Sequence, residues 1–223
     1  RGAFFDQRHQ LVSCERLEEI LRDDHWKADW QALTVDGEDG EPPEIRLVAR
    51  PEHRVLAEIR ESLDEYDAVV REHGRRLQLL GIGVAGHVGF IENGAAARDT
   101  HTTLVRLASS TMEANAPDWY LRNDDGEVRI PPSRFALTQG IASLLDHTSA
   151  LVMMAWGKSK QTALRKMFLQ PPGPNNPAAW LQEHDNVTVY LDAAAFGELR
   201  VRDLEDRGWL VKADSSIAQL TGV

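Results

Sequence analysis

The sequence contains a single cysteine, Cys14, among its 223 residues. An intramolecular disulfide is therefore excluded, and so is a cysteine-rich zinc site. No apolar run approaches the ~18 residues that a membrane-spanning helix needs, and no signal peptide is recognisable. We therefore expect a cytoplasmic protein with no membrane partner. No group of histidines and carboxylates has the spacing of metal ligands, so no metal is predicted.

Basic residues are outnumbered by acidic ones. The 25 Lys and Arg residues stand against 35 Asp and Glu residues, which gives a formal net charge of −10. Without a basic patch, nucleic acid is not an expected partner. An acidic surface repels anionic metabolites at long range, so a phosphate ligand would need a local lysine, arginine or set of backbone N–H groups.

Hydrophobic periodicity predicts alternating strands and helices. Apolar runs predict strands at residues 2–6, 77–82, 103–107, 150–155 and 187–191. Helical spacing predicts helices at residues 14–22, 52–73, 136–145, 157–168 and 178–184, a helix from Ser110 that Pro117 interrupts, and a helical tail after Ala193. Gly74 is the expected C-cap of the long helix. Residues 31–45 contain a polar, acidic loop, VDGEDGEPPE.

The strands at 77–82, 150–155 and 187–191 are short and continuously apolar, as strands covered on both faces are. We therefore predict an α/β fold: a doubly wound, mostly parallel sheet with helices on both faces, in one domain spanning residues 1–223. Ligands of such folds bind beyond the carboxyl ends of the strands. Asp6, the loop at 81–92 and the turn at 157–160 all follow predicted strands.

The stretch LLGIGVAGHVGFIENG, residues 79–94, carries the strongest functional signal. Its glycines match the spacing GxGxxG, but no helix follows them, which disfavours a Rossmann nucleotide site. His87 can exchange protons near neutral pH, and Glu92 can orient it. On the residues alone, a His87 that only caps a loop and a solvated Glu92 are an equally good interpretation.

The same stretch resembles the signature of the glucosamine-6-phosphate deaminases, GIG-x-(Asp or Asn)-GHI-(Ala or Gly)-FNEPG. Further segments resemble that family in the same order: HTTLVRLASSTMEANA, ALTQGIASLLD, ALVMMAWGKSKQTAL and WLQEHDNVTVYLD. The resemblance covers residues 49–192. The related 6-phosphogluconolactonases share part of the core, but they have a Ser-Leu-Phe-Pro run where this chain has GFIEN.

The resemblance implies an enzyme that opens the ring of an amino-sugar phosphate, moves a proton from C2 to C1, and releases ammonia and a ketose phosphate. It implies no cofactor, a small sugar phosphate as ligand, and a homo-oligomer. By position in the motifs, His87 is the ring-opening histidine, Glu92 its supporting carboxylate and Asp6 the C2 base. Phosphate and substrate binding falls to Lys160, Gly83, Gly86 and Gly157.

Three departures from the family pattern matter. Ala85 stands where the signature has Asp or Asn, and Pro117 stands where the family has an arginine that grips phosphate. Glu92 is followed by Asn93-Gly94 in place of the usual Pro-Gly, and Ile91 replaces the Asn before it. The family's first phosphate loop also lies upstream of the catalytic aspartate, so we expect strand and helix elements to precede Arg1. Two alternatives stay open beside the deaminase: lactone hydrolysis on 6-phosphogluconolactone, and a non-catalytic protein that binds sugar phosphates.

The other polar side chains are given structural or solvated roles. His53 and His73 flank the long helix and are expected to be solvated. His184 matches a family histidine but is equally consistent with a structural role. Asp64, Glu65 and Asp67 are expected to form a solvated helix face.

Overall fold

The computed structural model describes residues 4–5, 11–12, 29–35, 44–95, 97–119, 134–197, 199–213 and 217–222. The chain divides into two compact units. Unit 1 comprises Arg1–Asp64 and Leu104–Leu137, and unit 2 comprises Glu65–Thr103 and Thr138–Val223. A short antiparallel pair, β1 (Phe4–Phe5) and β2 (Leu11–Val12), lies in unit 1.

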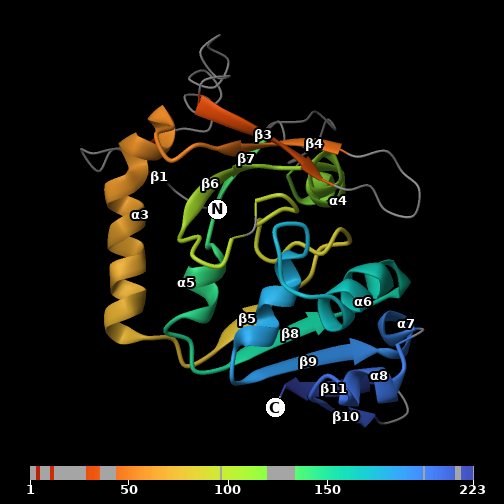
Figure 1. Ribbon diagram of the computed structural model, residues 1–223. Helices are drawn as coiled ribbons and strands as arrows, with labels where there is room; N and C mark the ends of the chain where they lie inside the picture. Colours follow the sequence, from red (N-terminus) through yellow and green to blue (C-terminus); the bar gives the residue numbers. More distant parts are fainter. Residues whose placement is uncertain are drawn as a thin grey trace, which may run out of the picture. The chain divides into compact units, whose positions relative to one another are not determined.

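Unit 1 contains a four-stranded sheet of order β3-β4-β6-β7 (Figure 1). The strands are β3 (Trp30–Val35), β4 (Glu44–Ala49), β6 (Thr103–Arg106) and β7 (Phe135–Thr138). β3 and β4 are antiparallel, with Trp30 opposite Ala49 and Val35 opposite Glu44. The sequence interpretation found only the acidic loop at 31–45. It missed these strands because β3 (WQALTV) and β4 (EIRLVA) are short, mix apolar with polar residues and adjoin that acidic loop.

The long helix α3 (Arg54–His73) confirms the prediction at residues 52–73. It ends at Gly74, which has a φ of +66° and donates its N–H to the carbonyl of Val70 at 2.8 Å. Its first turns contribute to a core cluster in unit 1: Trp30, Val55, Leu56, Ile59, Leu63 and Leu104. No described helix is both long enough and apolar enough to cross a membrane.

His53 is the N-cap of α3 and is buried, so the expectation of a solvated histidine was wrong. Its Nδ1 accepts hydrogen bonds from the backbone N–H groups of Val55 (3.1 Å) and Leu56 (3.4 Å). The ring also lies edge-on to Trp30, with centroids 4.8 Å apart. Burial is the main cause that lowers the pKa of His53. A neutral imidazole thus satisfies two helix N–H groups that would otherwise lack an acceptor.

This cap predicts a loss of stability in mild acid. The pKa of His53 is lowered on folding, so the unfolded chain takes up the proton first as pH falls below about 6.5. The contribution of this cap to the free energy of unfolding is therefore fully present above that pH and declines below it. Urea unfolding at pH 7.5 and pH 5.5 measures the decline. His53→Asn keeps a capping oxygen that does not titrate, so its pH dependence should be shallower than that of the wild type. Equal slopes would contradict the prediction.

Unit 2 is built on a five-stranded sheet of order β10-β11-β9-β8-β5 (Figure 1). β5 (Gln78–Leu80), β8 (Leu151–Ala155) and β9 (Val187–Asp192) are parallel neighbours and confirm three predicted strands. β11 (Ile217–Gly222) and β10 (Trp209–Ala213) extend the sheet antiparallel to β9. The α/β class is confirmed. The sheet is mixed, with its parallel part confined to β5, β8 and β9.

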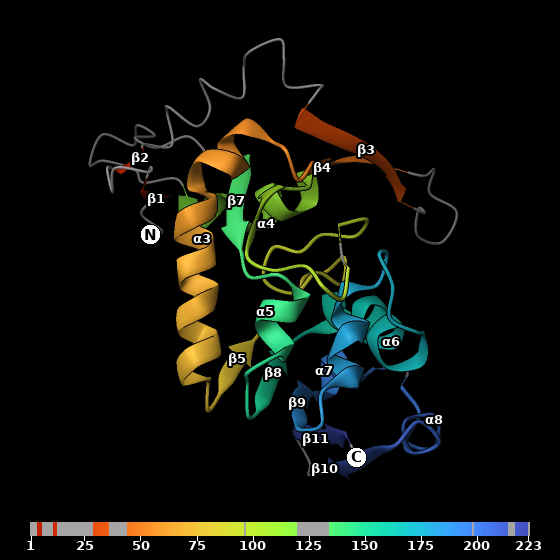
Figure 2. The same ribbon diagram turned by 60° about the vertical axis from the view of Figure 1, so that its left-hand side comes forward.

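One face of this sheet is buried. In β9 the side chains of Val187, Val189 and Leu191 are buried, while the residues between them are half-buried. α5 (Ile141–Leu145) and α6 (Gln161–Leu169) lie on the same side of the sheet in both ribbon views (Figures 1 and 2). Short helical turns complete the unit: η1 (Lys158–Lys160), η2 (Pro177–Glu183), α7 (Ala193–Phe196) and α8 (Val201–Glu205).

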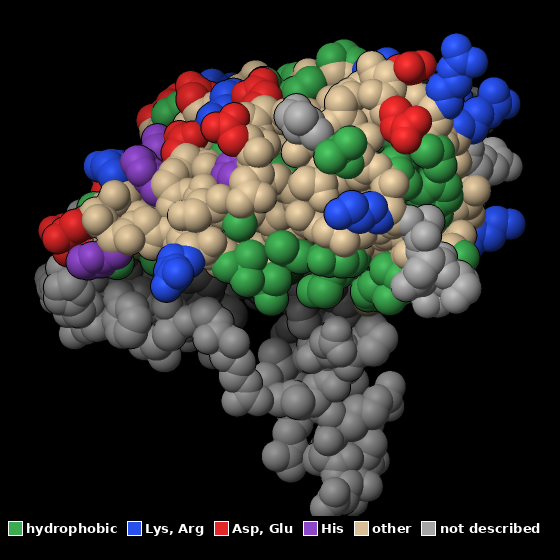
Figure 3. All heavy atoms as spheres, turned by 90° about the horizontal axis from the view of Figure 1, so that it is seen from below, with side chains coloured by type: hydrophobic (Ala, Val, Ile, Leu, Met, Phe, Trp, Pro, Cys, Tyr) green, Lys and Arg blue, Asp and Glu red, His purple; other side chains and the backbone are tan. Residues whose placement is uncertain are grey.

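Several apolar side chains of unit 2 are exposed. Leu79 of β5, Met154 of β8, Leu210 of β10 and Ile217 of β11 belong to this group. Figure 3 views the molecule from below and shows hydrophobic side chains gathered over part of this lower face. The alternation of buried and exposed residues in β8 places Met153 in the core and Met154 on the outside.

Three predicted elements differ from the structure. The expected helix at 136–145 begins only at Ile141, because residues 135–138 form β7. Gly140 marks the change: a Cβ there would lie 2.2 Å from the carbonyl oxygen of Thr100. The helix α4 (Ser109–Trp119) continues through Pro117 instead of stopping before it. The tail after Ala193 contains β10 and β11 besides two short helices.

Asp67 is buried, so it does not belong to the solvated face predicted for α3. Its carboxylate accepts hydrogen bonds from the Thr102 N–H (3.0 Å), the Thr102 hydroxyl (2.7 Å) and the Ser143 hydroxyl (2.7 Å). The network joins α3 to the segment before β6 and to α5, all within unit 2. Three donors to one carboxylate offset the cost of burying its charge.

Candidate active site

The candidate site lies beyond the carboxyl ends of the three parallel strands of unit 2. The loop after β5 contains the glycines and His87, the turn after β8 contains Gly157 and Lys160, and Asp192 ends β9. Because parallel strands end at the same edge of a sheet, these three segments are neighbours. Two hydrogen bonds described below join them directly.

The glycine loop is compact around His87. The Gly83 N–H donates to the carbonyl of His87 at 2.9 Å, and the Gly86 N–H donates to the carbonyl of Gly83 at 3.0 Å. Gly86 has a φ of +88°, a conformation that favours glycine. A Cβ at Gly83 would lie 2.1 Å from Cε1 of the His87 ring. The imidazole therefore lies directly against the backbone of Gly83, in space that only glycine leaves open.

His87 and Glu92 meet across the loop. The His87 Nδ1 lies 3.4 Å from the Glu92 Oε2, and the two side chains are only 14% and 3% exposed. Glu92 is therefore not solvated, and the structure favours the paired interpretation over the loop-cap alternative. A buried carboxylate beside an imidazole fixes the orientation of the ring.

The far end of the loop is held by backbone and side-chain hydrogen bonds. The Phe90 N–H donates to the Thr138 hydroxyl at 2.9 Å, and the Gly94 N–H donates to the carbonyl of Pro174 at 2.8 Å. Between these two points, the Asn93 side chain donates to the carbonyl of Ala85 at 2.9 Å. These bonds restrict the loop on both sides of Glu92.

Lys160 reaches from the β8 turn to the glycine loop. Its Nζ donates to the carbonyl of Ile82 at 2.7 Å, immediately before Gly83. Burial lowers the pKa of Lys160. A partly buried ammonium group is better stabilised by an anion than by a single carbonyl, so this position suits a phosphate group.

Gly157 shapes the turn that carries Lys160. Its φ of +85° favours glycine, and its carbonyl accepts the Lys160 N–H at 3.2 Å. The Gly157 N–H donates to the Asp192 carboxylate at 2.9 Å, and the same oxygen accepts the Ala195 N–H at 2.7 Å. Asp192 thus joins the ends of β8 and β9. The sequence interpretation missed it, although an Asp between an apolar strand and Ala-Ala-Ala is a helix N-cap signal.

The predicted site residues are therefore only partly brought together. His87, Glu92, Lys160 and the three glycines belong to one connected group of loops in unit 2. Asp6 lies outside the described residues. Ala85 contributes its backbone carbonyl to the loop, and its methyl group offers no hydrogen bond. Pro117 lies in α4 of unit 1.

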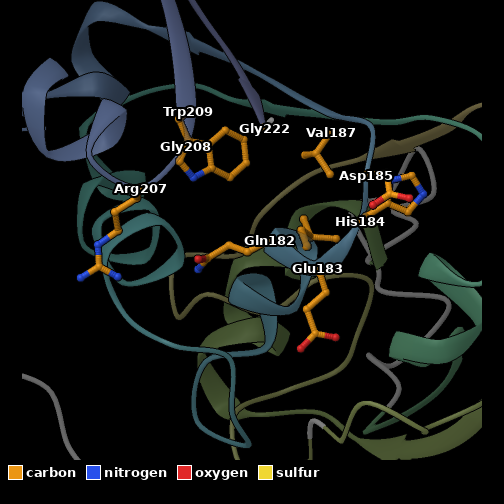
Figure 4. A pocket seen from close by; sticks show the side chains of 10 residues that line it. Gln182, Glu183, His184, Asp185, Val187, Arg207, Gly208, Trp209 and Gly222 are labelled. Atoms are coloured by element: carbon orange, nitrogen blue, oxygen red, sulfur yellow. The ribbon is translucent and has the colours of Figure 1, made fainter.

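A separate hollow lies at the opposite end of β9. It has a volume of about 330 Å³ and is lined by Gln182, His184, Val187, Arg207 and Trp209 among others (Figure 4). Two of its polar side chains, His184 and Gln182, have protein partners. His184 bonds the carbonyl of Thr148 (2.8 Å) and the Asn186 N–H (3.1 Å), which gives it a structural role. Gln182 donates to the carbonyl of Gln170 at 3.0 Å.

No group of three or more His, Cys, Asp or Glu side chains within the described ranges is arranged to hold a metal ion. The catalytic chemistry available to the described site is thus that of an imidazole, a carboxylate and an ammonium group. Together they suit proton transfer on a small anionic ligand.

Comparison with known proteins identifies relatives of this chain, although no family model matches it. It is 40% identical to a glucosamine-6-phosphate deaminase of Rhodopirellula baltica over 139 residues, covering 62% of this chain and 52% of the relative. It is 42% identical to the enzyme of that name from Streptococcus equi subsp. zooepidemicus over 135 residues, covering 60% and 53%. The chain thus spans about half the length of the curated relatives that it matches.

A solved structure gives the same result. A monomeric glucosamine-6-phosphate deaminase, described as a missing link of the NagB superfamily, matches with a TM-score of 0.53 and 33% identity. The match covers 61% of this chain and 54% of that one. The resemblance predicted from the motifs is therefore confirmed: the chain has homologues named glucosamine-6-phosphate deaminase and shares their α/β fold.

Proposed function

We propose that this chain acts as a glucosamine-6-phosphate deaminase, converting an amino-sugar phosphate to a ketose phosphate and ammonia. The observation that carries the proposal is the buried carboxylate of Glu92, 3.4 Å from the His87 ring, in a loop to which the Lys160 ammonium is bonded. The relatives reported above carry the same enzyme name, which supports deamination over the alternatives.

His87 is the group assigned to ring opening. The sugar ring opens when the anomeric hydroxyl loses a proton and the ring oxygen gains one. An imidazole performs both transfers, because it accepts and donates protons near neutral pH. Glu92 orients the ring and stabilises its positive charge between the two transfers. Burial of the pair strengthens this interaction relative to water.

The next step moves a proton from C2 to C1. A carboxylate base removes the C2 proton from the open-chain sugar, and C1 is protonated as the double bond shifts. The motifs assign Asp6 as that base. Hydrolysis of the resulting imine consumes one water and releases ammonia, which leaves a ketose phosphate. Every atom of the net reaction comes from substrate and water.

Lys160 is assigned to the phosphate. Its ammonium group has three N–H donors, one of which serves the Ile82 carbonyl. A phosphate dianion provides the negative charge that a partly buried ammonium group favours. The short separation along the chain between Ile82 and His87 brings phosphate binding and ring opening into one loop.

The test is turnover. The chain is incubated with glucosamine 6-phosphate, and ammonia and fructose 6-phosphate are measured together. Equal molar amounts of both products support the proposal. Hydrolysis of 6-phosphogluconolactone without deamination supports the lactonase alternative, and thermal stabilisation by sugar phosphates without turnover supports a binding protein. Either result overturns the deaminase assignment.

Lys160→Gln is expected to raise KM for glucosamine 6-phosphate by about 10–100-fold, because it removes the charge from the phosphate position. Lys158→Gln is the matched control, since Lys158 lies in the same turn η1 and is exposed. Steady-state kinetics and binding of inorganic phosphate measure the effect. Equal behaviour of the two variants would contradict the role given to Lys160.

A further inference from the structure

Asn93 is the buried residue after Glu92, and its side chain crosses the glycine loop. It is 6% exposed, and its Nδ2 donates to the carbonyl oxygen of Ala85 at 2.9 Å. A backbone carbonyl only accepts hydrogen bonds, so the amide nitrogen must face Ala85, and the orientation of the amide is fixed. The Asn93 side chain therefore ties the two ends of the stretch that contains His87.

The oxygen of the same amide has no such partner. Oδ1 of Asn93 is buried, and no donor among the described residues bonds to it. Buried acceptors nearly always have a donor, because leaving one unpaired costs stability. A buried acceptor next to a candidate catalytic pair can take a donor from water or from a bound ligand.

Position 85 gives this acceptor a role. The Ala85 methyl group cannot form a hydrogen bond, so the side chain at position 85 cannot bind a polar group of a sugar. The Asn93 amide lies against the backbone of the same residue, although it comes from the other end of the loop. The loop thus contains a polar group beside residue 85 that the sequence at 85 does not provide.

We propose that Asn93 determines specificity at this site: its Oδ1 accepts a hydrogen bond from a hydroxyl or amino group of the sugar. The inference rests on the function proposed above, because it requires a sugar phosphate in the loop. Lys160 recognises the phosphate and Asn93 recognises the sugar. Inorganic phosphate has no sugar donor, so its binding does not depend on Asn93.

The experiment compares two probes in each variant. Dissociation constants for glucosamine 6-phosphate and for inorganic phosphate are measured by calorimetry with the wild type and Asn93→Ala. We expect the variant to bind the sugar phosphate about ten-fold more weakly and inorganic phosphate unchanged. Asn93→Ser, whose hydroxyl can still donate to a carbonyl, replaces the alanine variant if that variant does not fold.

Asn176→Ala is the matched control. Asn176 is a buried asparagine of the same unit, 8% exposed, and its Nδ2 also donates to backbone carbonyls, those of Lys166 (3.1 Å) and Pro171 (3.2 Å). Its replacement removes a comparable amide outside the His87 loop. We expect the control to keep the wild-type preference for the sugar phosphate.

The outcomes separate this inference from the proposed function. Selective loss of sugar binding in Asn93→Ala supports it, even when the wild type shows no turnover, in which case only the proposed function fails. An unchanged sugar preference, or an equal loss for both probes, overturns it. A wild type that binds inorganic phosphate as tightly as the sugar phosphate also overturns it, and a wild type that binds neither overturns both proposals.

Discussion

Replacing Gly83 by alanine is expected to lower kcat/KM for glucosamine 6-phosphate by about 10²–10⁴-fold, as much as replacing His87 itself. The new Cβ would lie 2.1 Å from the His87 Cε1 and 2.3 Å from both ring nitrogens. Atoms cannot approach that closely, so the imidazole must leave its place beside Glu92. The alanine variant therefore removes the proton-transfer group without removing the histidine.

Gly81→Ala is the control for this prediction. Gly81 lies two residues earlier in the same loop, and a Cβ there would meet no atom within 4 Å. It should keep wild-type kinetics. Inorganic phosphate binding should survive in Gly83→Ala, because the Lys160 bond involves the carbonyl of Ile82. A Gly83→Ala variant with wild-type kcat/KM would show that the observed position of the His87 ring is not the catalytic one.

The sequence predicted best those parts that depend on continuous apolar runs. β5, β8 and β9 are such runs, and the glycine loop and the Lys160 turn follow two of them directly. Because these strands are parallel neighbours, their positions alone bring His87 and Lys160 to one edge of the sheet. The sequence therefore predicted those residues of the candidate site that directly follow an apolar strand.

Short antiparallel strands were predicted poorly. β3, β4, β10 and β11 are antiparallel strands that flank loops or chain ends. Each is only five or six residues long and mixes apolar with polar residues without a regular period, a weak signal beside neighbouring glycines and prolines. β7 was assigned to a helix because only Gln139 and Gly140 separate FALT from the apolar residues of α5. The chain changes from strand to helix at Gly140. Glycine is required there because the backbone of Thr100 lies too close for a Cβ, and not because of a local propensity.

Buried polar groups were not predictable from the sequence. His53 and Asp67 were expected to be solvated, and nothing in the residues around Asn93 marks it as buried. Their partners explain their burial: two helix N–H groups for His53, Thr102 and Ser143 for Asp67, and Ala85 for Asn93. Most of these partners are distant in sequence or belong to the backbone, so no local pattern reveals them.

Asp67→Ala is expected to lower the free energy of unfolding by about 3 kcal/mol or more. The carboxylate accepts three hydrogen bonds of 3.0 Å or less, from Thr102 and Ser143. Hydrogen bonds to a charged group contribute about 1.5–3 kcal/mol each, and donors left buried without an acceptor add a further cost. Both partners are buried, so water does not easily replace the lost oxygen atoms.

Asp64→Ala provides the comparison on the same helix. Asp64 lies three residues before Asp67 in α3 and is exposed, so its replacement should change stability by less than about 0.5 kcal/mol. Urea unfolding monitored by circular dichroism gives both values, with equal m-values as the sign that the unfolded states are alike. Because Asp67 holds the segment before β6 and the start of α5, its loss should also expose backbone amides of Thr102 and Thr103 to hydrogen exchange. If the two variants unfold at the same urea concentration, the carboxylate network does not stabilise unit 2.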